Sequence, residues 1–130
     1  MIGFISSVGA PLADARTNIG LGTDATFEDA GSTSNIAIGA AALNSTTDDA
    51  QKNIAIGENS LTALTTADNN VAVGWNAGTS IDDGNGNVHI GRDSGLVDEG
   101  GQNNVSVGTS SMYFGTDSDS NIAIGSQALF

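Results

Sequence analysis

The sequence predicts an all-β protein, a parallel β-solenoid in which each coil of the chain takes 17 residues. A five-residue motif of Asn, aliphatic, small, aliphatic and Gly recurs seven times, and its Asn residues are spaced by 17, 18, 17, 17, 17 and 17. Thirteen of the fourteen aliphatic positions are Ile or Val. Because β-branched residues in alternation favour strand over helix, each motif predicts one short strand.

The seven motifs follow one another through nearly the whole chain, beginning at Asn18, Asn35, Asn53, Asn70, Asn87, Asn104 and Asn121. A period of 17 residues is too short for a strand and a crossover helix, but it fits a coil of two strands and two turns. Coils stacked in register place Asn on Asn and Gly on Gly, so identical neighbours satisfy one another's hydrogen bonds and packing. The single spacing of 18 requires one extra loop residue and leaves the register of both strands intact.

The rest of each period divides into a second apolar contact and a polar loop. A small residue stands seven places after every Asn, and in four copies the next residue is large and apolar, namely Leu43, Leu61, Met112 and Leu129. Segments such as residues 82–86 and 117–120 are rich in Asp, Gly, Asn and Ser, which is typical of loops. We therefore divide the chain into a seven-repeat β-roll at 18–130 and an N-terminal attachment or degenerate capping coil at 1–17.

Composition excludes several classes of function. The 130 residues include 15 Asp or Glu and 3 Lys or Arg, giving a net charge of −12 that excludes binding to a nucleic-acid backbone. The absence of Cys removes disulfides, thiol zinc sites and cysteine nucleophiles. No window approaches the 18 or more apolar residues of a membrane span, so no membrane insertion is expected. The N-terminal stretch has no basic residue before Arg16 and fails as a signal peptide, which predicts a protein made in the cytoplasm.

The small residue in the middle of each motif points to a partner. It faces the opposite way from its two aliphatic neighbours, and on a face open to water we expect Thr, Lys or Glu there. The column instead predicts an oligomer interface formed by Gly20, Ala37, Ala55, Ala72, His89, Ser106 and Ala123. The alternative is that each thin coil is covered by its own second strand.

The repeat resembles that of a known group of proteins. Asn35-Ile36-Ala37-Ile38-Gly39, with the small residues and the Leu43 that follow, resembles the head repeats of trimeric autotransporter adhesins and, more closely, repeats of bacteriophage tail fibres. The resemblance covers residues 18–130 and implies a homotrimeric, left-handed parallel β-roll. Secreted adhesins of that kind need an export signal and a membrane anchor, and the lack of both in this sequence favours a phage particle.

The function expected from this resemblance is that of a structural protein on the surface of a bacteriophage virion. It would be a short trimeric spike, a capsid decoration or a fibre module, made in the host cytoplasm and bound to other virion proteins. A receptor-binding adhesin is the first alternative, and a carbohydrate-active tailspike is the second.

Three groups of side chains are candidates for more specific roles. His89 is the only histidine, and three copies around a threefold axis predict a transition-metal site, with a hydrogen-bonded structural histidine as the alternative. Trp75 and Arg92 share with Glu58 the place five residues after Asn, so they form a column that predicts receptor contact. The Asp pairs of the loops are interpreted as solvated charges. With one His, no Cys and no grouping of Ser, His and Asp, the sequence predicts no enzyme and no cofactor.

Overall fold

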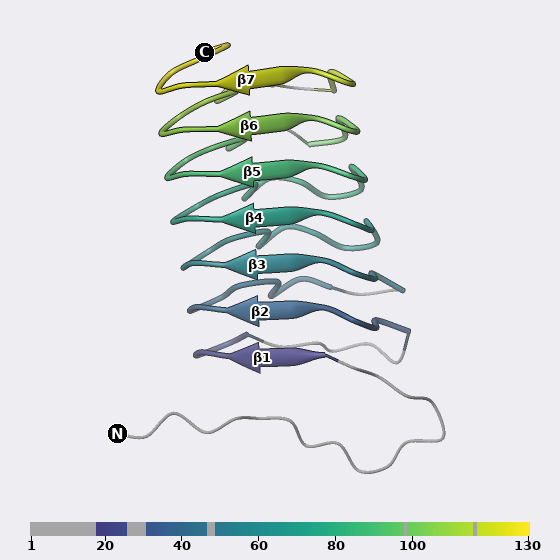
Figure 1. Cartoon of the computed structure of the whole chain (residues 1–130). Helices are drawn as coiled ribbons and strands as arrows, with labels where there is room; N and C mark the ends of the chain where they lie inside the picture. The colour runs from purple at the N-terminus through teal and green to yellow at the C-terminus, as the bar shows by residue number, and fades with distance from the viewer. Residues whose placement is uncertain (1–17, 26–30, 47–48, 98, 116) are drawn as a thin grey trace.

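The chain winds into a stack of coils with one short strand in each (Figure 1). The structure, a computed structural model, describes residues 18–25, 31–46, 49–97, 99–115 and 117–130. The seven strands pair in parallel and in chain order to form one sheet. They are β1 (Ile19–Leu21), β2 (Ile36–Ile38), β3 (Ile54–Ile56), β4 (Val71–Val73), β5 (Val88–Ile90), β6 (Val105–Val107) and β7 (Ile122–Ile124). The parallel solenoid of 17-residue coils is thus confirmed, whereas the predicted capping coil at 1–17 lies outside the described residues.

The register of the sheet follows the motif without a slip, even at the spacing of 18. Ile36 pairs with Ile54 in the same way as Ile54 pairs with Val71. Thr46 lies buried 11 residues after its Asn, as Leu64 does, so the additional residue falls between positions 46 and 50. The loop therefore absorbs the insertion, as predicted.

The motif Asn residues tie each coil to the next at two points. The Oδ1 of Asn53 accepts a hydrogen bond from the backbone N–H of Asn70 at 2.9 Å, and its Nδ2 donates to the carbonyl oxygen of Ala67 at 2.7 Å. The same pair of bonds repeats at Asn18, Asn35, Asn70, Asn87 and Asn104. Five of these six Asn residues have no exposed surface, namely Asn35, Asn53, Asn70, Asn87 and Asn104. A primary amide suits this place because it accepts and donates at once.

The motif glycines occupy places that no other residue fits. Each has a φ between +125° and +144°, which is strained for a residue with a side chain. A Cβ built on Gly57 would lie 2.3 Å from the carbonyl oxygen of Gly74 in the next coil. Glycine is thus required both for the local turn and for the close stacking of coils.

The wall opposite the sheet differs from the predicted second strand. Within the described residues each coil has one strand, and the opposite wall is built of turns in which residues with left-handed backbone recur six and eight places after Asn. Leu43 and Leu61 adopt φ values of 51° and 49° there. Their side chains have no exposed surface, and this burial offsets the roughly 1–2 kcal/mol cost of the left-handed conformation. The turns still pair from coil to coil, as from the Leu43 N–H to the Ser60 carbonyl oxygen at 3.1 Å.

The space between the two walls is filled by small residues from the sheet and larger ones from the turns. Ala37, Ala55 and Ala72 pack in one buried cluster with Leu43 and Leu61. This confirms the second inward contact predicted from the repeat. No helix long and apolar enough to cross a membrane occurs among the residues that the structure describes.

We predict that Asn70→Ala destabilises the fold by about 3 kcal/mol, because it leaves the buried Asn87 N–H and Gly84 carbonyl without their partners. Urea unfolding followed by circular dichroism measures the change. Gln102→Ala, which removes an exposed amide, is the control and should stay within about 0.5 kcal/mol of the parent. Equal losses in the two variants would contradict the role assigned to the Asn column.

Candidate functional site

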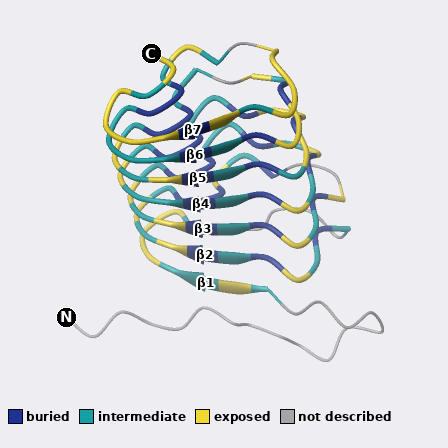
Figure 2. Ribbon diagram, turned by 45° about the horizontal axis from the view of Figure 1, so that its top comes forward, coloured by how far each residue is buried: buried dark blue, intermediate teal, exposed yellow. Residues whose placement is uncertain are grey.

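The outer face of the sheet is a continuous aliphatic surface. In each strand from β2 to β6 the middle residue is buried and its two neighbours are partly or fully exposed, which Figure 2 shows as dark centres flanked by lighter segments. Ile38 and Ile56 each have 37% of their surface exposed, and Ile122 of β7 has 74%. We call the fourteen outward residues of β1 to β7 the aliphatic face. It forms two columns of Ile, Val and Leu that run the length of the stack.

The predicted oligomer interface is therefore on the wrong side of the sheet. Apart from Gly20, which is partly exposed, the middle residues are at most 2% exposed and line the interior of their own coil: Ala37, Ala55, Ala72, His89, Ser106 and Ala123. Their small size reflects the short distance to the opposite wall. The alternative, that each coil covers them itself, is correct, although turns rather than a strand form the cover.

The aliphatic face is the feature that the sequence interpretation missed. Contiguous exposed apolar surface on a soluble protein marks an interaction site more often than isolated exposed residues do. A signal was present in the sequence, since none of the fourteen outward positions is polar or charged although the whole chain carries a net charge of −12. An outward face in contact with water would instead carry polar side chains, so polar and apolar residues would alternate along each strand.

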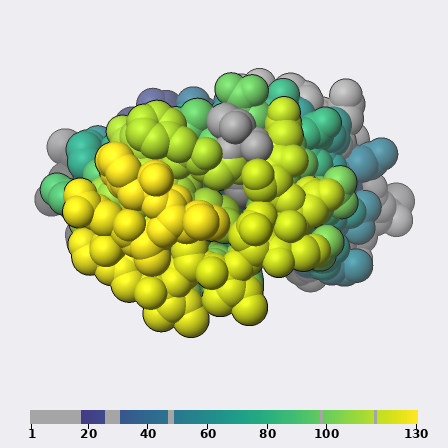
Figure 3. Space-filling model, turned by 90° about the horizontal axis from the view of Figure 1, so that it is seen from above, coloured from purple at the N-terminus to yellow at the C-terminus, as the bar shows by residue number. Residues whose placement is uncertain are grey.

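A smaller apolar cluster lies near the C-terminal end of the stack. The ring centroid of Tyr113 lies 4.7 Å from that of Phe114 and 5.4 Å from that of Phe130. Phe114 and Phe130 are 59% and 64% exposed. Figure 3 looks down the stack onto this last coil, drawn in yellow. The three residues follow their motif Asn by nine or ten places, so the cluster belongs to the turns and not to the strands that form the aliphatic face.

His89 lies inside the solenoid and takes part in a chain of buried hydroxyl groups. Its Nδ1 lies 2.6 Å from the Oγ of Ser106, which in turn lies 2.5 Å from the Oγ of Ser94. The Oγ of Ser94 also lies 3.1 Å from that of Ser111. All four residues have no exposed surface. The network satisfies polar groups that would otherwise be costly to bury.

The imidazole takes up space that is filled by leucine in other coils. A Cβ built on Gly95 would lie 2.2 Å from the Nδ1 of His89, and one on Gly78 would lie 3.3 Å from its Cδ2. Gly78 and Gly95 occupy the place that Leu43 and Leu61 take in earlier coils. The larger residue on the sheet thus compensates for the two smaller residues on the turns.

This position is incompatible with the metal site predicted for His89. The His89 side chains of three copies would each lie inside their own solenoid and would not converge on a common axis. The geometric premise of that prediction is therefore wrong. Within the described part of the chain there is no group of three or more His, Cys, Asp or Glu that could hold a metal ion. Burial also lowers the pKa of His89 from 6.5 to about 4, so the ring is neutral at pH 7.

Neither the histidine nor the loop carboxylates form an arrangement suited to catalysis. The contact between His89 and Ser106 resembles a base with a nucleophile, but both residues are fully buried, which keeps substrate away. Asp82, Asp83, Glu99 and Asp117 line an open depression on the loop side. The depression is open to solvent and all four residues are exposed, which favours the interpretation of their carboxylates as solvated charges.

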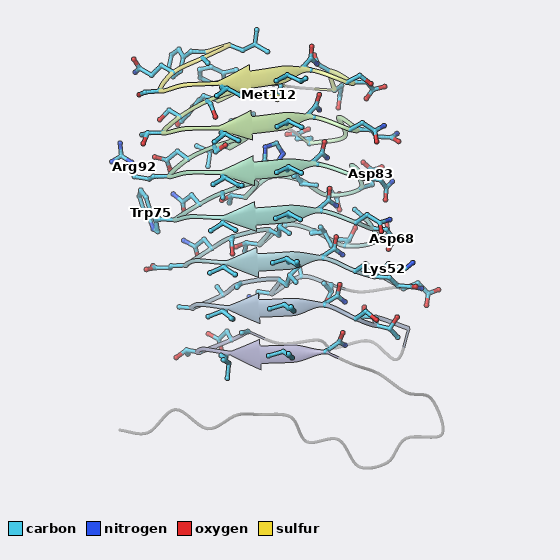
Figure 4. The ribbon with its side chains drawn as sticks, viewed as in Figure 1. Lys52, Asp68, Trp75, Asp83, Arg92 and Met112 are labelled. Atoms are coloured by element: carbon cyan, nitrogen blue, oxygen red, sulfur yellow. The ribbon has the colours of Figure 1, made fainter. Side chains whose placement is uncertain are left out.

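The predicted column of Glu58, Trp75 and Arg92 is present. Backbone hydrogen bonds join neighbouring coils at this column. The Asn76 N–H donates to the carbonyl oxygen of Glu58, and the Asp93 N–H donates to that of Trp75. Figure 4 shows Trp75 and Arg92 at the same edge of the sheet, just beyond the ends of the strands. Trp75 is 47% exposed, and the exposed Arg92 forms an ion pair with its neighbour Asp93, with Nε 3.5 Å from Oδ2. Receptor contact by these residues stays a prediction.

Comparison of the chain with models of protein families, with curated proteins and with solved structures finds no match. The function is therefore argued from the geometry of the chain itself.

The buried histidine predicts a loss of stability in acid. Because the pKa of His89 is about 4 in the folded chain and 6.5 in the unfolded chain, protons bind preferentially to the unfolded form. Stability is full above pH 6.5 and falls as the pH drops toward 4, by about 3 kcal/mol per chain from this group. The difference in unfolding free energy between pH 7 and pH 4 measures the effect.

The matched control for this prediction is the double variant His89→Ala/Gly95→Leu. It restores the leucine found in other coils, at a φ of 59° that Leu43 and Leu61 nearly share, and it removes the titrating group. Carboxylates contribute equally to both proteins, so the parent should lose more stability in acid than the double variant. Equal losses would contradict the assignment to His89.

Proposed function

We propose that this chain is a non-enzymatic structural module that assembles as a homotrimer of parallel solenoids, with the three aliphatic faces meeting at a central axis. The observation that carries the proposal is the aliphatic face itself, an uninterrupted surface of fourteen Ile, Val and Leu side chains. Burial of such a surface stabilises an assembly by about 25 cal/mol for each Å² removed from water.

The repeat spacing favours a second copy of the chain as the partner. The strands of the sheet repeat at about 4.8 Å, so only a surface with the same spacing can match every level of the aliphatic face. Another copy has that spacing by construction. The rest of the molecule carries the acidic loops, and like charges there disfavour association through any other side.

The width of the face favours three copies. Each strand presents two outward side chains, such as Ile54 and Ile56 of β3. In a threefold assembly each sheet contacts two neighbours, so each of the two columns serves one neighbour. The resemblance of the repeat to those of phage tail fibres and trimeric adhesins supports the same number and implies left-handed winding of the coils.

We assign this trimer to the surface of a bacteriophage virion, as a spike, decoration or fibre module attached to other virion proteins. The resemblance of the repeat supports this location. The physical properties suit it as well, because a rod tied together by a polar ladder at every coil resists unfolding while its acidic loops face outward. A host receptor is a further partner in such a setting.

The assembly is tested by its mass and by one substitution on the aliphatic face. Light scattering should give three times 12.9 kDa, or 38.7 kDa. Ile56→Asp places a carboxylate on a side chain that is 37% exposed in the single chain, so a monomer tolerates it, but in the trimer it brings three carboxylates to the axis. We expect this variant to be a folded monomer.

The control is Thr66→Asp, which adds the same charge at an exposed loop residue and should leave the trimer intact. A monomeric parent protein, or a trimer that is unchanged by Ile56→Asp, would refute the proposed assembly.

The location is tested separately by electron microscopy. Antibodies raised against the folded trimer are expected to label intact phage particles that carry the chain, at a constant place on the head or the tail. Release of a sugar product from host polysaccharide by the purified trimer would favour the enzymatic alternative. Particles without label, with the chain found only in the soluble fraction, would exclude a virion role.

A further inference from the structure

The basic residues of the described chain lie at opposite ends of the strands. They are Lys52, two residues before β3 begins, and Arg92, two residues after β5 ends. Figure 4 shows them on opposite edges of the sheet. Both side chains are exposed. In a chain with a net charge of −12, the placement of these two cations strongly affects which surfaces attract each other.

Each cation has a carboxylate at the other end of its own coil. Glu58 follows β3 by two residues, so the sheet separates it from Lys52. Asp83 precedes β5, and Figure 4 shows it on the same edge as Lys52 and near the level of Arg92. Glu58 and Asp83 are exposed as well. Within a single chain the width of the sheet lies between the members of each pair.

Rotation about an axis parallel to the stack brings these ends together. In a ring of copies whose sheets face the axis, the ends of the strands in one copy lie beside the beginnings of the same strands in the next. Glu58 of one copy then meets Lys52 of its neighbour, and Arg92 meets Asp83. Both contacts join opposite charges at the same level.

We propose that Lys52–Glu58 and Arg92–Asp83 form ion pairs between copies and set the register of the parallel trimer. The inference rests on the proposed function, since it takes the trimer as its premise. The aliphatic face cannot set the register alone, because its levels are nearly identical and a slip by one coil would uncover only one level. A slip in one direction brings Glu58 opposite Asp68, where two carboxylates repel. A slip in the other breaks both ion pairs and joins Arg92 to Asp68 instead, so only one of the two pairs is replaced.

The test measures dissociation of the full chain by sedimentation equilibrium at low salt. Arg92→Glu turns three attractions per trimer into three repulsions, and we expect it to raise the midpoint concentration for dissociation by about tenfold. Adding Asp83→Arg restores the attraction and should return the midpoint to within about threefold of the parent. Lys52→Glu and its double variant with Glu58→Lys should behave in the same way. In about 1 M salt the differences should nearly vanish.

A matched control separates position from net charge. Asp117 precedes Asn121 by four residues, as Asp83 precedes Asn87, but it lies two coils further along. The double variant Arg92→Glu/Asp117→Arg has the net charge of the rescued protein without its pairing, so it should dissociate as readily as Arg92→Glu alone. Far-ultraviolet circular dichroism should match the parent throughout, because every substituted side chain is exposed.

The outcomes distinguish this inference from its premise. A parent protein that is monomeric refutes the proposed trimer and this inference with it. A trimer whose midpoint does not respond to Arg92→Glu or Lys52→Glu refutes the ion pairs and leaves the trimer standing. An antiparallel dimer centred on β4 would join Arg92 to Glu58, so rescue of Arg92→Glu by Glu58→Arg rather than by Asp83→Arg would overturn the parallel arrangement.

Discussion

The Asn column is the interaction on which the rest of the structure depends. Each buried amide forms hydrogen bonds with two backbone groups of the next coil. One is an N–H at the start of the strand, and the other is a carbonyl oxygen in the loop before it. A carboxylate could not donate, and a hydroxyl is too short to reach both groups. The amide therefore fixes the spacing and register of adjacent coils together. At this fixed spacing the motif glycines, such as Gly57, leave no room for a Cβ against the next coil. Every other position acquires a constant neighbour one coil away.

A constant spacing also sets the size of the interior. The turns lie close behind the sheet, so the inward strand residues are Ala or Ser wherever leucine or methionine stands at the matching place in the turns. His89 is the exception, and it is tolerated because Gly78 and Gly95 leave room for the ring. Its nitrogen Nδ1 is then satisfied by Ser106, in a coil whose middle residue is Ser instead of Ala. A larger or polar residue in the core is thus accommodated by smaller or hydrogen-bonding residues at facing positions in the same and adjacent coils.

The period, the strands, their register and the loop insertion could be predicted because each follows from residues that repeat at a fixed spacing. The side of the sheet that faces inward could not, since alternation separates two faces without naming the buried one. Composition favours the large Ile and Val as core residues, whereas the narrow coil admits only small ones. The turn wall was also missed, because Ala41 and Leu43 carry no sequence sign of a left-handed backbone. The candidate site was misplaced for the first of these reasons.

Regular stacking leaves the register between two repeating faces poorly specified. A face that repeats at every level binds an equal face strongly but in several registers of similar free energy, as flat strands do in general. Discrimination among registers must come from groups that do not repeat. In this chain the edges of the sheet vary in charge from coil to coil while its aliphatic face is apolar at every level. Lys52, Asp68 and Asp83 lie at one edge and Trp75 and Arg92 at the other, where Glu58 follows β3 by two residues. In the proposed assembly, affinity and register belong to different surfaces, so mutation at the edges would alter register without loss of the apolar contact between copies.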